Sequence, residues 1–269
     1  MYSFEYLRPT DRASALKALV GDSRYLAGGQ SLVQAMKLRL SSSERLVDLG
    51  GVADLGGIRV EGGRVVIGAM CSHASVARSP EVRGEISALA ELAGGIGDPM
   101  VRSMGTIGGS IANADPAACY PAAVLALGAS VVTDRRTIPA EAFFTGVFET
   151  ALEAGELILE VSFPIPQRAA YVKFRQPASR FALVGVFVCQ GPGSVRVAVT
   201  GAKASVFRCG EIEAALSLDF TPQAAASVQL GCDDFSSDIH APAEYRAAMV
   251  SVMAARAVSN ALACATAIS

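Results

Sequence analysis

The feature that most constrains this fold is the segment GDPMVRSMGTIGGSIANADPAAC, residues 97–119. It follows neither a helical nor a strand periodicity, and it is rich in Gly, Asn, Asp and Pro. Loops of this length are uncommon inside a compact domain, and those that occur are usually functional. We therefore expect a long structured loop that contacts a ligand, with the regular elements packed around it.

A second glycine-rich segment, AGGQS at residues 27–31, lies between a strand expected over 24–27 and a helix expected to reach about Leu40. Consecutive glycines let backbone N–H groups converge on one point, and the start of a helix adds positive potential there. GTIGGS at 105–110 offers a similar set of donors inside the long loop. Either segment can also be a tight turn without a ligand. The residues alone leave both interpretations open: a site for a phosphorylated ligand, or two structural turns.

The remaining pattern predicts a mixture of helices and strands in two domains. The stretch FPIP at 163–166 separates them, because proline disfavours a continuing helix or strand. We expect a first domain over 1–166, with subdomains of about 1–56 and 57–166, and a second domain over 167–269. In the first domain the expected strands are 45–49, 129–133, 156–163 and a hairpin over 58–69, and the expected helices are one after Ser72, 81–93 and 121–127. In the second domain, three antiparallel strands over 170–176, 183–190 and 194–201 precede helices at 210–217, 221–230 and 242–267.

Several classes of protein are excluded by what the chain lacks. A net charge of −2 and the absence of Trp argue against a nucleic-acid partner. The six cysteines form no CxxC pair, and His73 and His240 have no neighbour at metal-ligand spacing, so we assign no metal site. Two histidines make a catalytic triad hard to build, and we assign no catalytic residue. Asp98 and Asp115 are interpreted as turn and capping residues, with an acid–base pair as the alternative.

The ends of the chain indicate a cytoplasmic protein. Its first twelve residues are mixed and charged, unlike a secretory signal peptide. The apolar tract 247–268 is interrupted by Arg256 and Asn260 and is dominated by Ala and Ser. We interpret this tract as a packed terminal helix and expect no integral membrane segment.

These segments resemble the FAD-binding subunits of the xanthine dehydrogenase and carbon monoxide dehydrogenase family of molybdenum hydroxylases. AGGQSLVQAMKLRL at 27–40 is similar to the first flavin loop of that family, and residues 97–129 are similar to its second. KFRQPASRFALVGV at 173–186 and DIHAPAEYRAAMVSVMAARA at 238–257 resemble its C-terminal domain. The similarity extends over essentially the whole chain, and the pattern TIGGS-x-AN-x-DPAA within it is highly specific.

The resemblance implies an α+β fold: a two-part FAD-binding domain of the PCMH type, then a small domain with a three-stranded antiparallel sheet and helices. It also implies a set of FAD contacts. The first loop would wrap the pyrophosphate, the second would add further contacts, Ile158 would pack on the flavin, Phe181 would lie beside the isoalloxazine, and Lys173 or Arg175 would supply a positive charge. The implied cofactor-binding residues are Ala27, Gly28, Gly29, Gln30, Ser31, Leu32, Thr106, Gly108, Gly109, Ser110, Asp115, Cys119, Ile158, Lys173, Arg175 and Phe181.

Two residues depart from the pattern of the family. Gln30 stands where relatives often carry His or Thr, and it can still donate and accept hydrogen bonds. Cys119 stands where the family usually has the acid of DPAA[DE]. A carboxylate there can hold a flavin or ribityl group by a charge-assisted hydrogen bond, whereas a thiol is a weak donor and a poor acceptor. We predict looser FAD or a shifted flavin potential relative to relatives with the acid.

The function implied is electron transfer within a larger complex. Non-covalent FAD would take electrons from the [2Fe–2S] clusters of a small partner subunit and pass them to an external acceptor. A large molybdopterin-binding subunit would choose and oxidise the substrate, so neither the substrate nor the acceptor is encoded in this chain. We expect a dimer of heterotrimers. The alternatives are a self-sufficient flavoprotein oxidase or dehydrogenase, which needs its own base over the flavin, and a flavin-free scaffold subunit.

Overall fold

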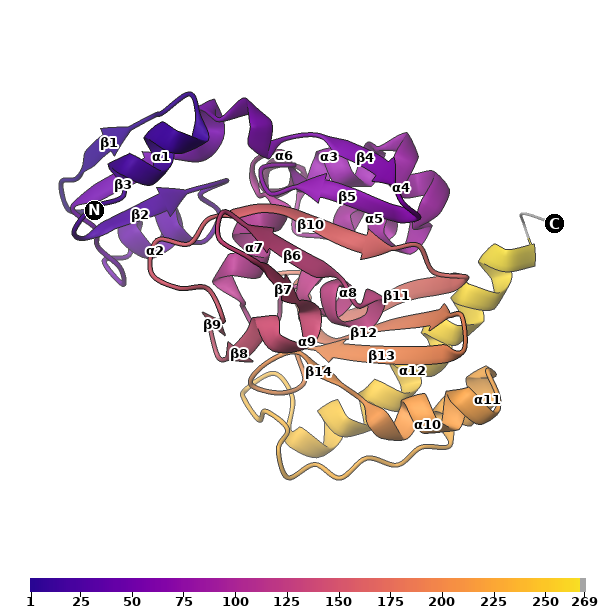
Figure 1. Cartoon of the computed structure of the whole chain (residues 1–269). Coiled ribbons are helices and arrows are strands. Elements are labelled where there is room, and N and C mark those ends of the chain that lie inside the picture. The colour runs from indigo at the N-terminus through magenta and orange to yellow at the C-terminus, as the bar shows by residue number, and fades with distance from the viewer. Residues whose placement is uncertain (267–269) are drawn as a thin grey trace.

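An N-terminal subdomain, a central subdomain and a C-terminal layer follow one another along the chain (Figure 1). The structure is a computed structural model that describes the backbone of residues 1–266 and the side chains of residues 1–263. Its combination of helices with parallel and antiparallel sheets confirms the α+β class. Within residues 1–266, no helix has both the length and the hydropathy that a membrane span needs.

The N-terminal subdomain is a small parallel sheet in the order β1-β3-β2. Leu46 of the middle strand is in register with Tyr6 on one side and Arg24 on the other. Parallel strands need crossover connections, which helices α1 and α2 supply. The Asp11 side chain caps α1 by accepting the backbone N–H of Ser14 at 2.9 Å. The elements are β1 (Glu5–Leu7), α1 (Arg12–Ala18), β2 (Ser23–Leu26), α2 (Leu32–Lys37), β3 (Arg45–Asp48), η1 (Leu49–Gly51) and η2 (Ala53–Leu55).

The central subdomain has a five-stranded antiparallel sheet in the order β4-β5-β10-β6-β7. Gly62 and Gly63 join β4 to β5 with φ of +55° and +71°, as a tight hairpin requires, which confirms the predicted hairpin. The strands are β4 (Ile58–Glu61), β5 (Arg64–Gly68), β6 (Ser130–Thr133), β7 (Thr137–Pro139) and β10 (Ile158–Pro164), and a separate ribbon contains β8 (Phe144–Gly146) and β9 (Glu149–Thr150). The helices are α3 (His73–Arg78), α4 (Pro80–Glu85), α5 (Ser87–Gly94), α6 (Pro99–Met104), α7 (Ile107–Asn113), α8 (Tyr120–Leu127) and α9 (Ala140–Phe143).

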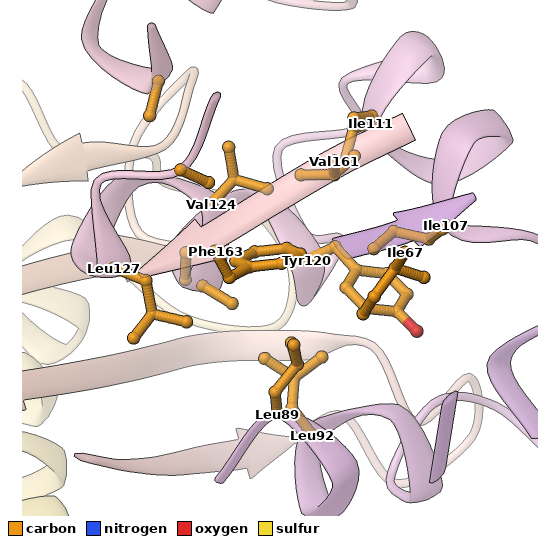
Figure 2. Packing of buried hydrophobic residues seen from close by; sticks show 14 of the residues in the cluster. Ile67, Leu89, Leu92, Ile107, Ile111, Tyr120, Val124, Leu127, Val161 and Phe163 are labelled. Carbon is orange, nitrogen blue, oxygen red and sulfur yellow. The ribbon is translucent and has the colours of Figure 1, made fainter. Parts of the chain in front are cut away.

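Helix α8 lies at the centre of the molecule, and all of its residues are buried. Figure 2 shows Tyr120, Val124 and Leu127 of this helix with Phe163 of β10 and Leu89 of α5 in one apolar cluster. A helix that is apolar on every side is stable only when it is covered on every side. The central sheet and the C-terminal sheet both pack against α8, so the two sheets share one hydrophobic core.

The C-terminal layer is an antiparallel sheet in the order β11-β12-β13-β14. Strand β12 is apolar on both faces: Val184, Val186 and Val188 pack toward helix α12, whereas Phe187 and Cys189 belong to the central core. Successive side chains of a strand point to opposite faces, and both faces of this strand are buried, so its sequence is almost continuously apolar. The elements are β11 (Arg168–Arg175), β12 (Ala182–Gly191), β13 (Ser194–Thr200), β14 (Phe207–Arg208), α10 (Gly210–Leu218), α11 (Pro222–Ala226) and α12 (Ala243–Thr266).

The structure corrects several predicted elements. Residues 97–119 are not irregular throughout, because Asp98 and Thr106 cap the short helices α6 and α7 with their side chains. The helix expected over 81–93 is two helices, interrupted at Ile86, whose φ and ψ of −140° and 68° are not helical. The predicted helices ending at Leu40 and spanning 221–230 stop at Lys37 and Ala226, and the C-terminal sheet has a fourth, two-residue strand, β14. The predicted end of the last helix at residue 267 lies outside the described residues.

Candidate functional site

One cavity of about 430 Å³ lies where the N-terminal subdomain, the central subdomain and the C-terminal sheet meet. Its wall is formed by residues 24–32, by parts of 96–119, by residues 156–158 and by side chains from 173 to 181. The volume is within the range of small-molecule and cofactor sites. Both glycine-rich segments thus open into the same space, although a long stretch of sequence separates them.

The first glycine-rich segment, residues 27–31, lines the cavity. Within the described chain, the N–H groups of Gly28, Gly29, Gln30 and Ser31 donate to no protein acceptor. Gly29 has a φ of +69°, a left-handed conformation that glycine adopts without strain. The Gln30 side chain donates from Nε2 to the Gly28 carbonyl at 3.2 Å and so braces the turn. Successive unpaired N–H groups of this kind form an anion-binding concavity.

The two glycine-rich segments are in direct contact. A Cβ atom on Gly28 would lie 2.0 Å from the carbonyl oxygen of Met104, so only glycine allows the first loop to approach the second this closely. In the second loop, a Cβ on Gly108 would lie 2.6 Å from the Cβ of Ala69. Thr106 Oγ1 accepts the N–H of Gly109 at 3.1 Å and fixes the start of α7. Both loops are therefore held in position by close packing.

The end of the second loop forms a turn from Asp115 to Cys119. Asp115 Oδ1 accepts the backbone N–H of Ala117 at 2.8 Å, and burial raises the pKa of this carboxyl group. Asp98 caps α6 instead, so the two acids have the turn and capping roles that the sequence favours. Cys119 is 5% exposed, and the Lys173 ammonium donates to its Sγ at 3.4 Å. Lys173 of β11 thereby contacts the end of the second glycine-rich loop, and both residues line the cavity.

Three buried polar atoms near this turn have no hydrogen-bond partner within residues 1–263. They are Nδ1 of His73 and the hydroxyls of Tyr120 and Tyr171. Burial, followed by the nearby Cys119, raises the pKa of both tyrosines. Burial, followed by the charge of Arg102, lowers the pKa of His73 to about 4. The imidazole is therefore neutral at pH 7.

His73 is a cavity residue that reasoning from the sequence missed. Its backbone N–H donates to the Gly105 carbonyl at 2.9 Å, and a Cβ on Gly105 would lie 2.6 Å from its Nε2. The signal that could have found it is the missing side chain at Gly105, which leaves room for a neighbouring ring. His240, the other histidine, is exposed.

Glu156 also lines the cavity and was not anticipated. Its carboxylate is fully covered and accepts from Arg136 at 3.0 Å through both Nε and Nη2, from Thr133 Oγ1 at 2.7 Å, and from the N–H of Glu153 at 2.7 Å. The hydrogen bonds from Arg136 contribute most to lowering its pKa to about 2. A carboxylate that is paired this completely is a structural anchor of the cavity wall.

The structure brings together most of the residues predicted for the site. Fifteen of them line the cavity: Ala27, Gly28, Gly29, Gln30, Ser31, Leu32, Thr106, Gly108, Gly109, Ser110, Asp115, Cys119, Ile158, Lys173 and Phe181. Ile158 is buried at the start of β10, and Phe181 is 48% exposed. Arg175 does not line the cavity, because its guanidinium lies beside Gly95, outside the wall. Arg24 and Arg180 line it instead, so the positive charge around this space comes from residues other than Arg175.

Comparison with known proteins identifies relatives of the chain. Residues 2–166 match the family described as the FAD binding domain in molybdopterin dehydrogenase. The carbon monoxide dehydrogenase medium chain of Hydrogenophaga pseudoflava is 37% identical, with 96% of each chain covered. The nicotine 6-hydroxylase medium subunit of Paenarthrobacter nicotinovorans is 35% identical, with 89% of this chain and 90% of the relative covered. The crystal structure of quinoline 2-oxidoreductase from Pseudomonas putida 86 contains a chain that superposes with a TM-score of 0.89 at 27% identity, with 98% of both chains covered.

Proposed function

This chain belongs to the family of FAD-binding domains of molybdopterin dehydrogenases, and from that membership we propose that it is the electron-transferring FAD subunit of a molybdenum hydroxylase complex. The observation that carries the proposal is the row of N–H groups without a protein acceptor at residues 28–31, which line one cavity together with Lys173 and Ile158. That row offers what a pyrophosphate needs, and the rest of the wall offers what a flavin ring needs.

The residues present fit FAD in three respects. The N–H groups of Gly28 to Ser31 supply donors for two phosphates, and no bulky side chain intervenes at the glycines. Ile158 is an apolar surface against which a flat ring system can pack. Lys173 places an ammonium group at the same end of the cavity as the Cys119 thiol. A polar, donor-rich half and an apolar half match the two halves of the cofactor.

The chain itself binds and positions, and it provides no acid or base for the reaction. FAD, when bound, supplies a carrier that exchanges electrons singly or in pairs. The first loop would hold the diphosphate, while Thr106 and the glycines near it keep the second loop against the first. Lys173 contributes positive charge to the cavity wall, which would favour the uptake of electrons by a bound flavin. Neutral His73 supports the Gly105 turn without adding a second charge.

The partners follow from the family. Two of the relatives named above are, by their names, the medium chain of a carbon monoxide dehydrogenase and the medium subunit of a nicotine 6-hydroxylase. Because their substrates differ while the flavin chains stay similar, we assign the choice of substrate to the large molybdopterin-binding subunit. A small subunit with [2Fe–2S] clusters would deliver the electrons. We propose a cytoplasmic dimer of heterotrimers as the assembly.

The test is a visible absorption spectrum of the purified full chain, recorded before and after acid precipitation. We expect a flavin spectrum that moves entirely to the supernatant, because no histidine or cysteine is proposed to be bonded to the ring. A spectrum retained on the precipitate would show covalent flavin and contradict this part of the proposal. A colourless chain that takes up no FAD, alone or with its partner subunits, would refute the proposed function.

A further inference from the structure

The second flavin loop is held from outside by the C-terminal domain. Thr200, the last residue of β13, is fully buried, and its hydroxyl lies 2.7 Å from both the Pro116 and the Ala118 carbonyl oxygens. The next residue, Gly201, donates its N–H to the same Pro116 carbonyl at 2.7 Å. Two neighbouring donors of one strand end thus bind the backbone of the Asp115–Cys119 turn, and neither Thr200 nor Gly201 lines the cavity.

The position of this strand end is itself fixed by a buried arginine. Gly201 has a φ of +81°, and its carbonyl accepts from Arg246 Nη1 at 2.7 Å. The same guanidinium donates to the Leu183 carbonyl at 3.0 Å and to Asp238 Oδ2 at 2.7 Å. Arg246 is 4% exposed, so these bonds form in a largely water-free interior. The Nε also donates to the Ala241 carbonyl at 3.4 Å, so each nitrogen of this buried cation has an acceptor and the guanidinium is held rigidly.

This network explains the segment DIHAPAEYR, which cofactor binding leaves unexplained. Asp238 and Arg246 are the two ends of the segment. The Arg246 guanidinium donates both to the Asp238 carboxylate and to the Gly201 carbonyl. Asp238 also accepts the N–H groups of His240 at 2.8 Å and Ala241 at 3.1 Å, which folds the segment into the turn before α12. The segment therefore acts on the strand end that contacts the flavin loop.

We propose that Thr200 is a positioning residue for the cofactor cavity, and that the Asp238–Arg246 pair holds the neighbouring Gly201 in place. Thr200 and Gly201 set the path of the Asp115–Cys119 turn, which carries Asp115 and Cys119 into the wall of the cavity. The C-terminal domain would thereby determine the geometry of a loop that belongs to the FAD-binding half. This inference rests on the proposed function only for the identity of the ligand, since the contacts to the turn are present in the chain itself.

The decisive variant is Thr200→Val, which keeps the shape of the side chain and removes the hydroxyl. The Ala118 carbonyl then loses the donor that it has in the structure, while Pro116 keeps Gly201. We expect the amides of Ala117 and Ala118, which close the turn on Asp115, to exchange with deuterium about tenfold faster in the FAD-free full chain, as loss of one buried hydrogen bond predicts. FAD should dissociate faster by a similar factor.

Two further variants separate positioning from general stability. Thr200→Ser retains the hydroxyl and should restore both exchange and FAD dissociation to nearly wild-type values. Ser251→Ala removes a hydroxyl that donates to the Val228 carbonyl at 2.6 Å in the same domain, away from the turn. It should lower thermal stability without changing either quantity.

Amide exchange at residues 117–118 that is no faster in Thr200→Val than in Ser251→Ala would overturn the positioning role of Thr200, as would faster exchange with unchanged FAD dissociation. A wild-type chain that binds no FAD, alone or with its partner subunits, would refute the proposed function. In that case the exchange measurement still shows whether Thr200 holds the turn, so the two failures are distinguishable.

Discussion

Replacing Cys119 with aspartate should tighten FAD, because the cavity already provides the partner that a carboxylate needs. Lys173 Nζ lies 3.4 Å from Cys119 Sγ, and no other bond from this ammonium occurs within residues 1–263. Burying a carboxylate alone would be unfavourable, and the result would be a protonated group with a raised pKa. Beside Lys173, the carboxylate of Cys119→Asp stays ionised and oriented toward the cavity.

The size of the effect follows from the distance. Two unit charges at the Lys173–Cys119 separation attract each other by about 1 kcal/mol in water and about 5 kcal/mol at an effective dielectric constant of 20. This attraction offsets the loss of hydration. The net gain in FAD binding is then a hydrogen bond from the cofactor to a charged acceptor in place of one to a thiol, and such a bond contributes about 1.5–3 kcal/mol. The FAD dissociation constant should fall about 10- to 100-fold, and the added negative charge should lower the flavin midpoint potential.

The assay compares the dissociation constant and the midpoint potential of wild type, Cys119→Asp and Cys119→Asn. Asparagine has nearly the same shape as aspartate but no charge, so it isolates the electrostatic contribution. We expect Asn to lie close to the wild type and Asp to differ from both. Equal affinity and potential for Cys and Asp, or equal values for Asp and Asn, would refute the argument that a missing anion weakens FAD in this chain.

Two further predictions follow from the geometry. Gly28→Ala places a methyl group 2.0 Å from the Met104 carbonyl oxygen, so it should separate the two loops and raise the FAD dissociation constant at least tenfold, measured by flavin release. The control Gly84→Ala adds a methyl group that meets nothing within 4 Å and should leave FAD binding unchanged. The pKa of His73 is about 4 in the folded chain and about 6.5 in the unfolded chain, so the unfolded chain binds the proton first as the pH falls. The free energy of unfolding should therefore decrease between pH 6.5 and pH 4. His73→Gln should flatten this pH dependence, measured by denaturant titrations at several pH values.

The sequence predicted the site better than it predicted the elements that carry the site. Glycine pairs and the pattern around Thr106 indicated both loops because those residues act through their own backbone. Lys173 and Ile158 were named through resemblance alone, since nothing local distinguishes a lysine or isoleucine in a strand. Arg175 is two residues beyond Lys173, and a regular strand would place both side chains on the same face. The register of β11 shifts between Phe174 and Arg175, and Arg175 lies outside the wall.

Predicted elements failed where capping or tertiary contacts decide the structure. The short helices α6 and α7 depend on single side-chain caps from Asp98 and Thr106, which are too local to produce a hydrophobic period. Strand β14 has two residues and exists only because β13 offers it an edge. His73 and Glu156 were missed for a related reason. They reach the cavity through contacts with Gly105 and Arg136, which are remote in sequence.

The chain can carry Cys119 without losing its cavity, because the backbone of this turn does not depend on the side chain at 119. The turn that bears this residue is held by Asp115 on one side and by Thr200 and Gly201 on the other, and none of these bonds involves the side chain at 119. A substitution there changes the charge that the cofactor meets while the path of the backbone is kept. Affinity and potential at this position can therefore vary among related chains independently of the fold, whereas a change at Gly28 or Thr200 alters the shape of the site itself.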